Sequence, residues 1–148
     1  MADLKIKIQE ELTLNGVDQG GIHQGTISGI TEFSKRIISL STTETTILTF
    51  SSAVGMGTYV AADVRYMRFT NLDTTNFIML TFKDEDNTEF RIKVGAGKSF
   101  LYCGDSGGVV DTMKANGSAL GSGLADLYDV TADADTAECQ LEVLIASA

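Results

Sequence analysis

Apolar and polar side chains alternate along several short segments of this chain, the pattern of a β-strand with one buried face. The segments LKIKIQ (4–9), EFRIKV (89–94) and ECQLEVLIA (138–146) alternate in this way. TNFIMLTFK (75–83) is apolar on both faces, so we expect a central strand between two layers. EFSKRIISLS (32–41) also fits a strand.

Turn-forming residues separate these segments. VRYMRFTNL (64–72) leads through DTTN into the central strand, which predicts a hairpin, and DEDN predicts a second hairpin with residues 89–94. VGAGKSFLY (94–102) places two glycines before a short aromatic strand, as expected at a corner. Further strands are predicted in VVDTMKA (109–115) and LADLYDV (124–130). The glycine-rich intervals are interpreted as loops: 15–29, 55–57, 95–97 and 104–123.

Eight to ten short strands with regular turn signals predict an all-β fold, an antiparallel β-sandwich or jelly roll. The 148 residues suffice for one domain with a real core, so we expect a single sandwich spanning residues 1–148. The chain has no proline, 15 glycines and 43% hydrophobic residues, a composition that suits strands and glycine turns.

The formal net charge of −9 opposes binding to nucleic acid or to anionic membranes. No apolar run reaches the roughly 20 residues of a membrane span, and the N-terminus lacks the pattern of a signal peptide, so we expect folding in a cytoplasm. Cys103 and Cys139 lack a metal or redox spacing and are expected to be free thiols, with Cys139 buried in its strand.

The run GDSGG (104–108) matches the surroundings of the nucleophilic serine in chymotrypsin-like proteases, which makes Ser106 a candidate nucleophile. His23 is the only histidine in the chain and so the only candidate for its base. With Asp63 or Asp73 as the third member, the residues follow the chain order histidine, aspartate, serine of these proteases. The setting GGIHQGT does not resemble that of such a base. We therefore interpret the run as a glycine turn and His23 as a loop residue, and predict no catalytic residue.

Four acidic side chains gather in KDEDNTEF: Asp84, Glu85, Asp86 and Glu89. Their spacing is wrong for a calcium loop, since the required glycine is missing, so we predict no metal site. GAGKS (95–99) is not a phosphate loop, because the first glycine of that motif would fall on Ile92 and a strand follows in place of a helix. We predict no cofactor. TADADTAE (131–138) is interpreted as a solvated acidic loop.

The segments YMRFTNLDTTNFIMLTF and FRIKVGAGKSFLY resemble small β-sandwich structural proteins of tailed bacteriophages, particularly marine phages and cyanophages. The N-terminal LKIKIQEELTLNGVDQG has a similar character. The resemblance covers about half of the chain and brings no catalytic residue with it. It implies a virion protein, of the capsid decoration (cement) type or alternatively a minor tail, neck or fibre-associated protein.

Such a protein would bind the major capsid protein or other virion proteins, as a homo-oligomer for which we expect a trimer on threefold positions. Residues 1–14 are predicted to be a contact strand that adds to the sheet edge of a neighbour, or else the first strand of the chain's own sandwich. The loops at 15–29 and 104–123 are further contact candidates. A serine protease and a glycan-binding module of a tail are the rival interpretations, the latter weakened by the absence of tryptophan.

Overall fold

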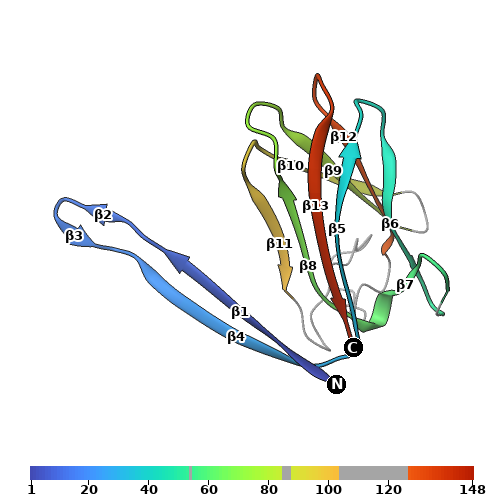
Figure 1. The fold of residues 1–148 in the computed structure, drawn as a ribbon, viewed down its shortest axis with the longest axis horizontal. Coiled ribbons are helices and arrows are strands. Elements are labelled where there is room, and N and C mark those ends of the chain that lie inside the picture. Colours follow the sequence, from blue (N-terminus) through green and yellow to red (C-terminus); the bar gives the residue numbers. More distant parts are fainter. Residues whose placement is uncertain (54, 85–87, 104–126) are drawn as a thin grey trace.

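The computed structural model describes residues 1–53, 55–84, 88–103 and 127–148, and its regular structure is almost entirely β-strand (Figure 1). The elements, in chain order, are β1 (Ala2–Glu10), β2 (Thr13–Leu14), β3 (Val17–Asp18), β4 (Gly21–Ile30), β5 (Glu32–Leu40), β6 (Thr45–Ser51), β7 (Tyr59–Val60), the 3-10 turn η1 (Ala61–Asp63), β8 (Val64–Asn71), β9 (Ile78–Asp84), β10 (Glu89–Val94), β11 (Ser99–Cys103), β12 (Leu127–Ala134) and β13 (Cys139–Ser147). The predicted all-β class is confirmed.

Two sheets pack face to face as a sandwich. One has five strands in the order β10-β9-β12-β6-β7, and the other has four in the order β11-β8-β13-β5. Neighbouring strands are antiparallel except for the short parallel pair of β6 with β7. Consecutive strands of the sequence often lie in different sheets, so the chain passes repeatedly over the ends of the sandwich.

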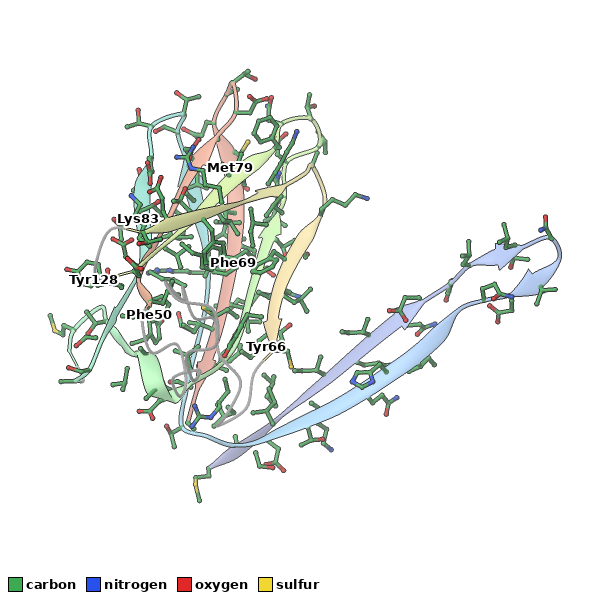
Figure 2. All side chains as sticks on the ribbon, turned by 180° about the vertical axis from the view of Figure 1, so that it is seen from behind. Phe50, Tyr66, Phe69, Met79, Lys83 and Tyr128 are labelled. Atoms are coloured by element: carbon green, nitrogen blue, oxygen red, sulfur yellow. The ribbon has the colours of Figure 1, made fainter. Side chains whose placement is uncertain are left out.

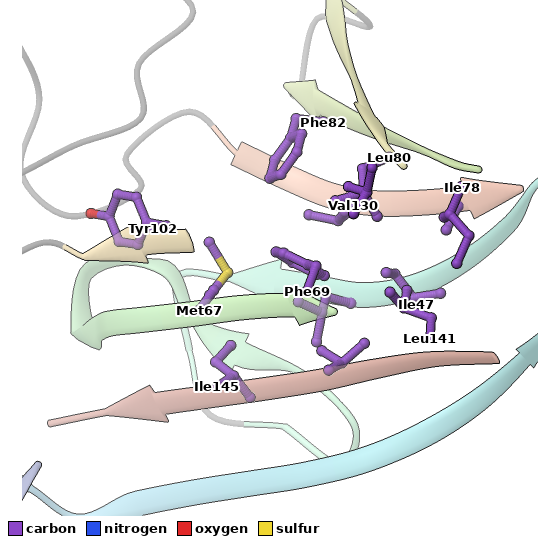
Figure 3. Packing of buried hydrophobic residues seen from close by; sticks show 14 of the residues in the cluster. Ile47, Met67, Phe69, Ile78, Leu80, Phe82, Tyr102, Val130, Leu141 and Ile145 are labelled. Carbon is purple, nitrogen blue, oxygen red and sulfur yellow. The ribbon is translucent and has the colours of Figure 1, made fainter. Parts of the chain in front are cut away.

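The core fills the space between the two sheets (Figure 3). Phe69 of β8 meets Phe82 of β9 edge to face, with ring centroids 6.0 Å apart, and Phe90 of β10 stacks on Phe82 at 4.9 Å. Each large side chain buried in this way contributes roughly 1.5–3 kcal/mol from removal of apolar surface from water. The alternation that predicted these strands is therefore the cause of the two-layer packing.

The predicted hairpin between residues 64–72 and the central strand is wrong, because β8 and β9 belong to different sheets. The fully buried Asn71 side chain donates to the carbonyl oxygens of Asn76 (2.9 Å) and Val94 (3.1 Å). Its oxygen accepts the backbone N–H of Asp73 (2.9 Å). The polar residues that suggested a tight turn instead hold a crossing from one sheet to the other.

The other predictions for this part of the chain are confirmed. β9 and β10 pair as an antiparallel hairpin, and β9 is central in its sheet, between β10 and β12. The glycine segment 95–97 turns the corner from β10 into β11 of the opposite sheet, with Gly97 in the left-handed region at φ 66°. Residues 32–40 form β5, an edge strand. The strand predicted at 109–115 lies outside the described residues. The strand predicted at 124–130 is confirmed from residue 127 on as part of β12 (Leu127–Ala134). The interpretation of residues 131–138 as a solvated loop is wrong for 131–134, because these residues continue β12 and three of them are buried.

The first 30 residues do not belong to the sandwich. β1 and β4 form a two-stranded antiparallel ribbon that projects from one end of it, and the short strands β2 and β3 continue this ribbon to its tip (Figure 1). We name residues 2–30 the arm. The prediction that residues 15–29 form a loop is wrong, since most of them lie in strands, and the interpretation of residues 1–14 as a strand of the sandwich is wrong as well.

Candidate functional site: the N-terminal arm

A single two-residue turn at Asn15 and Gly16 closes the arm. Both residues have positive φ, 52° and 77°, which are the values that a type I′ hairpin turn requires. Asparagine and glycine tolerate this conformation best, because a larger side chain clashes with the backbone there. The dipeptide therefore fixes where the chain reverses.

One register extends from this turn almost to the base of the arm. Leu14 pairs with Val17 next to the turn, the N–H of Gln19 donates to the carbonyl oxygen of Leu12 (2.7 Å), and the same spacing continues to the pair of Leu4 with Ile27. The register shifts only between Ala2 and Leu4, at the base. Gly29 lies there with φ 80°, a conformation that suits a bulge.

This register gives the arm two unlike faces, because paired residues of a ribbon share a face and successive residues alternate between faces. One face carries a row of aliphatic residues that we name the apolar stripe: Leu4, Ile6, Ile8, Leu12, Leu14, Val17 and Ile27. Glu10, Gln19 and His23 lie on the same face and interrupt the row near its middle. The opposite face carries lysine, glutamine, glutamate and threonine, with Ile22 as its one aliphatic residue among 4–27. The arm is thus amphipathic along its length.

Among the described residues, those of the sandwich cover the base of the stripe. Leu4, Ile6 and Ile27 pack with Ile30 against a small cluster on the outer face of the four-stranded sheet, where Tyr66 is 6% exposed. Farther out, Leu12 is 55% exposed, and Leu14 and Val17 of the tip are both 56% exposed. Figure 2 shows the side chains of the distal arm pointing into solvent on both sides of the ribbon.

A ribbon of this kind needs a partner. A two-stranded hairpin is marginally stable at best in water unless its apolar face packs on something else. A row of exposed aliphatic side chains, here interrupted by Glu10, is also a common mark of a protein interaction site. We therefore take the arm, and its stripe in particular, as the candidate functional site.

The outer faces of the two sheets combine ion pairs with exposed apolar side chains, among them Phe33 and Ile37 of β5. Lys83 Nζ lies 2.8 Å from Glu44 Oε1 on the five-stranded sheet, and the hydroxyl of Thr131 donates to the same oxygen. These hydrogen bonds, first that of Lys83, hold the pKa of the Glu44 carboxyl below its usual value, and the bond to Glu44 raises the pKa of Lys83. On the four-stranded sheet, Glu142 pairs in the same way with Arg68 and Lys35.

The protease candidates are separated by the fold as far as the structure describes them. His23 lies on β4 in the arm, paired with Ile8, whereas Asp63 ends η1 and Asp73 lies in the crossing between β8 and β9. Within the described part of the chain, no hydrogen bond or ion pair reaches the ring of His23. The run 104–108 with Ser106 lies outside the described residues, so the protease interpretation stays an untested alternative.

No group of three or more potential metal ligands occurs in the residues that the structure describes. Asp84 is buried at the end of β9 and accepts the backbone N–H of Thr88 (2.6 Å), as a residue of the hairpin connection does. Cys139 is buried and Cys103 exposed, and both are free thiols. Burial raises the pKa of the Cys139 thiol. None of the described helical structure is long and apolar enough to span a membrane.

Comparisons with known proteins do not identify a family for this chain. No known family matches the chain, and no curated protein matches it. Among solved structures, the chain is similar to one from work on Bacillus endospore appendages, described as a novel family of disulfide-linked pili. The identity is 15%, the match covers 81% of this chain and 88% of the other, and the TM-score is 0.44. A likeness of this size does not establish a shared function.

The sequence contained the signal for the arm. Leu14-Asn15-Gly16-Val17 places Asn-Gly between apolar residues, the strongest short-range sign of a hairpin. The interpretation of residues 15–29 as a loop overlooked this signal. It therefore overlooked the return strand β4, which forms the second half of the arm. The contact candidate at 104–123 lies outside the described residues.

Proposed function

We propose that this chain is a non-enzymatic structural protein of a virion, most simply a decoration protein of a phage capsid, and that the arm is its principal contact element. The sandwich presents the arm, and the apolar stripe binds a neighbouring protein of the particle. Assembly would take place in the host cytoplasm and would involve the major capsid protein or another virion protein. In the alternative, in which the protein is a minor tail, neck or fibre-associated protein, the apolar stripe makes the same kind of contact with a neighbouring protein.

The observation that carries this proposal is the exposed outer part of the stripe. Tight, non-covalent assembly depends on buried apolar surface and close packing. The four-stranded sheet also exposes Phe33, Ile37 and Leu101, but beside the ion pairs of Glu142, whereas the distal stripe exposes its aliphatic residues on a ribbon that has no core of its own. The arm offers aliphatic side chains without a partner, on a ribbon that is stabilised by acquiring one. Repetition of one contact over a symmetric shell then multiplies its effect through avidity.

The direct experiment measures binding of the purified chain to capsids that lack their decoration protein. Replacing Leu12 and Leu14 with lysine places two charges on the stripe, and we expect binding to fall at least tenfold, because a charge buried without a partner is costly. The matched control replaces Gln9 and Thr13, on the polar face of the same strands, with lysine and should bind as the unchanged chain does.

Two results would contradict the proposal. One is equal binding by the stripe variant and the control. The other is labelling of Ser106 by a fluorophosphonate with loss of self-cleavage in Ser106→Ala, which would favour the protease alternative. If the chain binds isolated tails in place of heads, the contact mode stands and the location changes.

A further inference from the structure

The two edges of the arm differ in the groups that they present. In an antiparallel ribbon, every second residue of each strand points its backbone N–H and C=O away from the partner strand. Counting from the two-residue turn, these outward residues are Lys5, Lys7 and Gln9 on β1, and Ile22, Gln24 and Thr26 on β4. Each set is a free template for another strand.

The edge of β1 is guarded against pairing with itself. In the antiparallel register that overlaps two copies of β1 most fully, Ile6 meets its equivalent and Lys5 of each copy faces Lys7 of the other. Like charges directly opposite each other destabilise a strand pair. Lysines on an edge strand are a common protection against unwanted association.

The edge of β4 has no such protection. Residues 19–31 contain no Asp, Glu, Lys or Arg, and β4 is the longest strand among the described elements. Its register with β1 is regular from Gly21 to Ile27. In both views, β4 runs along the side of the arm that faces away from the sandwich, so its edge is accessible to another molecule (Figures 1 and 2).

We infer that the free edge of β4 pairs with β4 of a second copy, antiparallel and related by a two-fold axis at Gln24. This inference rests on the proposed function only because it treats the arm as the contact element. It adds that the partner at the β4 edge is a second copy of the chain. The product is a four-stranded sheet in the order β1-β4-β4-β1. Since the two-fold axis is perpendicular to this sheet, the apolar stripes of both copies lie on the same face.

Side-chain sizes along β4 match this register. With Gln24 opposite its equivalent, His23 of each copy faces Gly25 of the other, and Ile27 faces Gly21. Each large side chain thus meets a glycine, and neither glycine has another heavy atom within 4 Å of the position of a Cβ. Ile22 faces Thr26, a pair of β-branched residues that suits neighbouring strands.

Joining two ribbons into one sheet also stabilises both of them. Three or more strands with one apolar face are stable where two alone are marginal. The combined face is twice as wide as that of one arm, and it remains available for the particle protein of the proposed function. A two-fold contact yields a dimer of the free chain in solution, whereas the sequence led us to expect a trimer.

Disulfide trapping tests the pairing. In a Cys103→Ser background, Gln24→Cys places two thiols across the axis, at the Cα separation of about 5.5 Å of a hydrogen-bonded antiparallel pair, which a disulfide spans. We expect mild oxidation to convert most of this variant to a covalent dimer. Gln9→Cys on the β1 edge is the matched control and should stay monomeric.

Sedimentation of the unoxidised chain gives a second readout. Gln24→Pro removes an outward N–H that the pairing of the two β4 strands needs, so we expect dimerisation to weaken by about fivefold or more, while Gln9→Pro, an outward position on the β1 edge, leaves it unchanged. Equal cross-linking of the two cysteine variants, or an unchanged chain that is monomeric or trimeric at every concentration, overturns the inference.

These outcomes are separable from those of the proposed function. If the chain is monomeric but the Leu12 and Leu14 variant loses capsid binding, the β4 pairing fails and the function stands. If Gln24→Cys cross-links but the stripe variant binds capsids normally, the pairing stands and the function fails.

Discussion

At the scale of single residues, Asn71 has the most consequential polar side chain of the described sandwich. It is fully buried and its amide links the end of β8 to carbonyl oxygens of Asn76 and of Val94 in β10, on the other sheet. One asparagine therefore fixes how the two sheets meet at this end. An apolar replacement would leave two buried carbonyl groups without their donor.

Asn71→Ala is expected to lower the free energy of unfolding by about 1–3 kcal/mol, since lost hydrogen bonds of buried groups are costly. Urea unfolding followed by tyrosine fluorescence measures this. Thr74→Ala, an exposed substitution in the same connection, should change it by less than about 0.5 kcal/mol. Equal stability of the two variants would show that the Asn71 amide does not hold the crossing.

The Glu44 carboxyl makes stability depend on pH in the acid range. Its pKa lies below the ordinary value of 4.5 because Lys83 and then Thr131 donate hydrogen bonds to it. A group with a lowered pKa in the folded state stabilises the fold above its unfolded pKa, and this contribution disappears as the pH falls through the folded pKa. The pair is partly exposed, so the effect is at most about 1 kcal/mol.

Glu44→Gln should accordingly lose less stability than the unchanged chain when the pH is lowered from about 6 to about 3. Thermal unfolding at a series of pH values measures the difference. Lys83→Gln removes the first donor and should flatten the profile in the same sense. If both variants keep the slope of the unchanged chain, the ion pair has no role in acid stability.

At the scale of elements, alternation predicted the strands well but not their partners. The segments around 4–9, 89–94 and 138–146 were predicted from period-two alternation, and the segment around 75–83 from its apolar character on both faces; all of them contain strands, as does 32–41. Sheet membership depends on contacts between distant residues, and no local pattern distinguishes a hairpin turn from a crossing over the core. The β8–β9 connection shows this, because its Asp and Asn residues suit both.

The arm was only half predictable. A strand within residues 1–14 was expected from its alternation, and Asn15-Gly16 supplied a local signal for the return strand. β4 itself alternates poorly, since glycines replace apolar residues at 21 and 25, so its pairing with β1 is not evident from its own sequence. That the ribbon stands outside the sandwich follows from packing at its base, which no sequence pattern specifies.

Gly16→Ala tests the turn that defines the arm. An L-residue at φ 77° is strained by roughly 1–2 kcal/mol, so we expect the hairpin pairing near the tip to weaken. Amide hydrogen exchange of residues 10–22 should quicken by tenfold or more, and the thermal midpoint of the sandwich should not move. Thr13→Ala, next to the turn in unstrained backbone, is the control, and faster exchange in the control alone would contradict this role for Gly16.

The described part of the whole molecule consists of two parts, the sandwich and the arm. The sandwich has a well-filled core, and its outer faces carry ion pairs beside exposed apolar residues such as Phe33 and Ile37. The arm has an amphipathic ribbon, one guarded edge, one unguarded edge and an apolar row that the described residues of the sandwich cover at the base. This division of roles suits a subunit that folds alone and is completed by assembly.

Hydrogen exchange of the arm, measured in the free chain and on the particle, decides whether the arm is the contact element. If the stripe is the contact element, amides of residues 2–30 should exchange at least tenfold more slowly on the assembled particle, while those of β8, β9 and β13 stay as they are in the free chain. If the arm exchanges at the same rate in both states and protection appears on the sandwich instead, the arm is not the contact element.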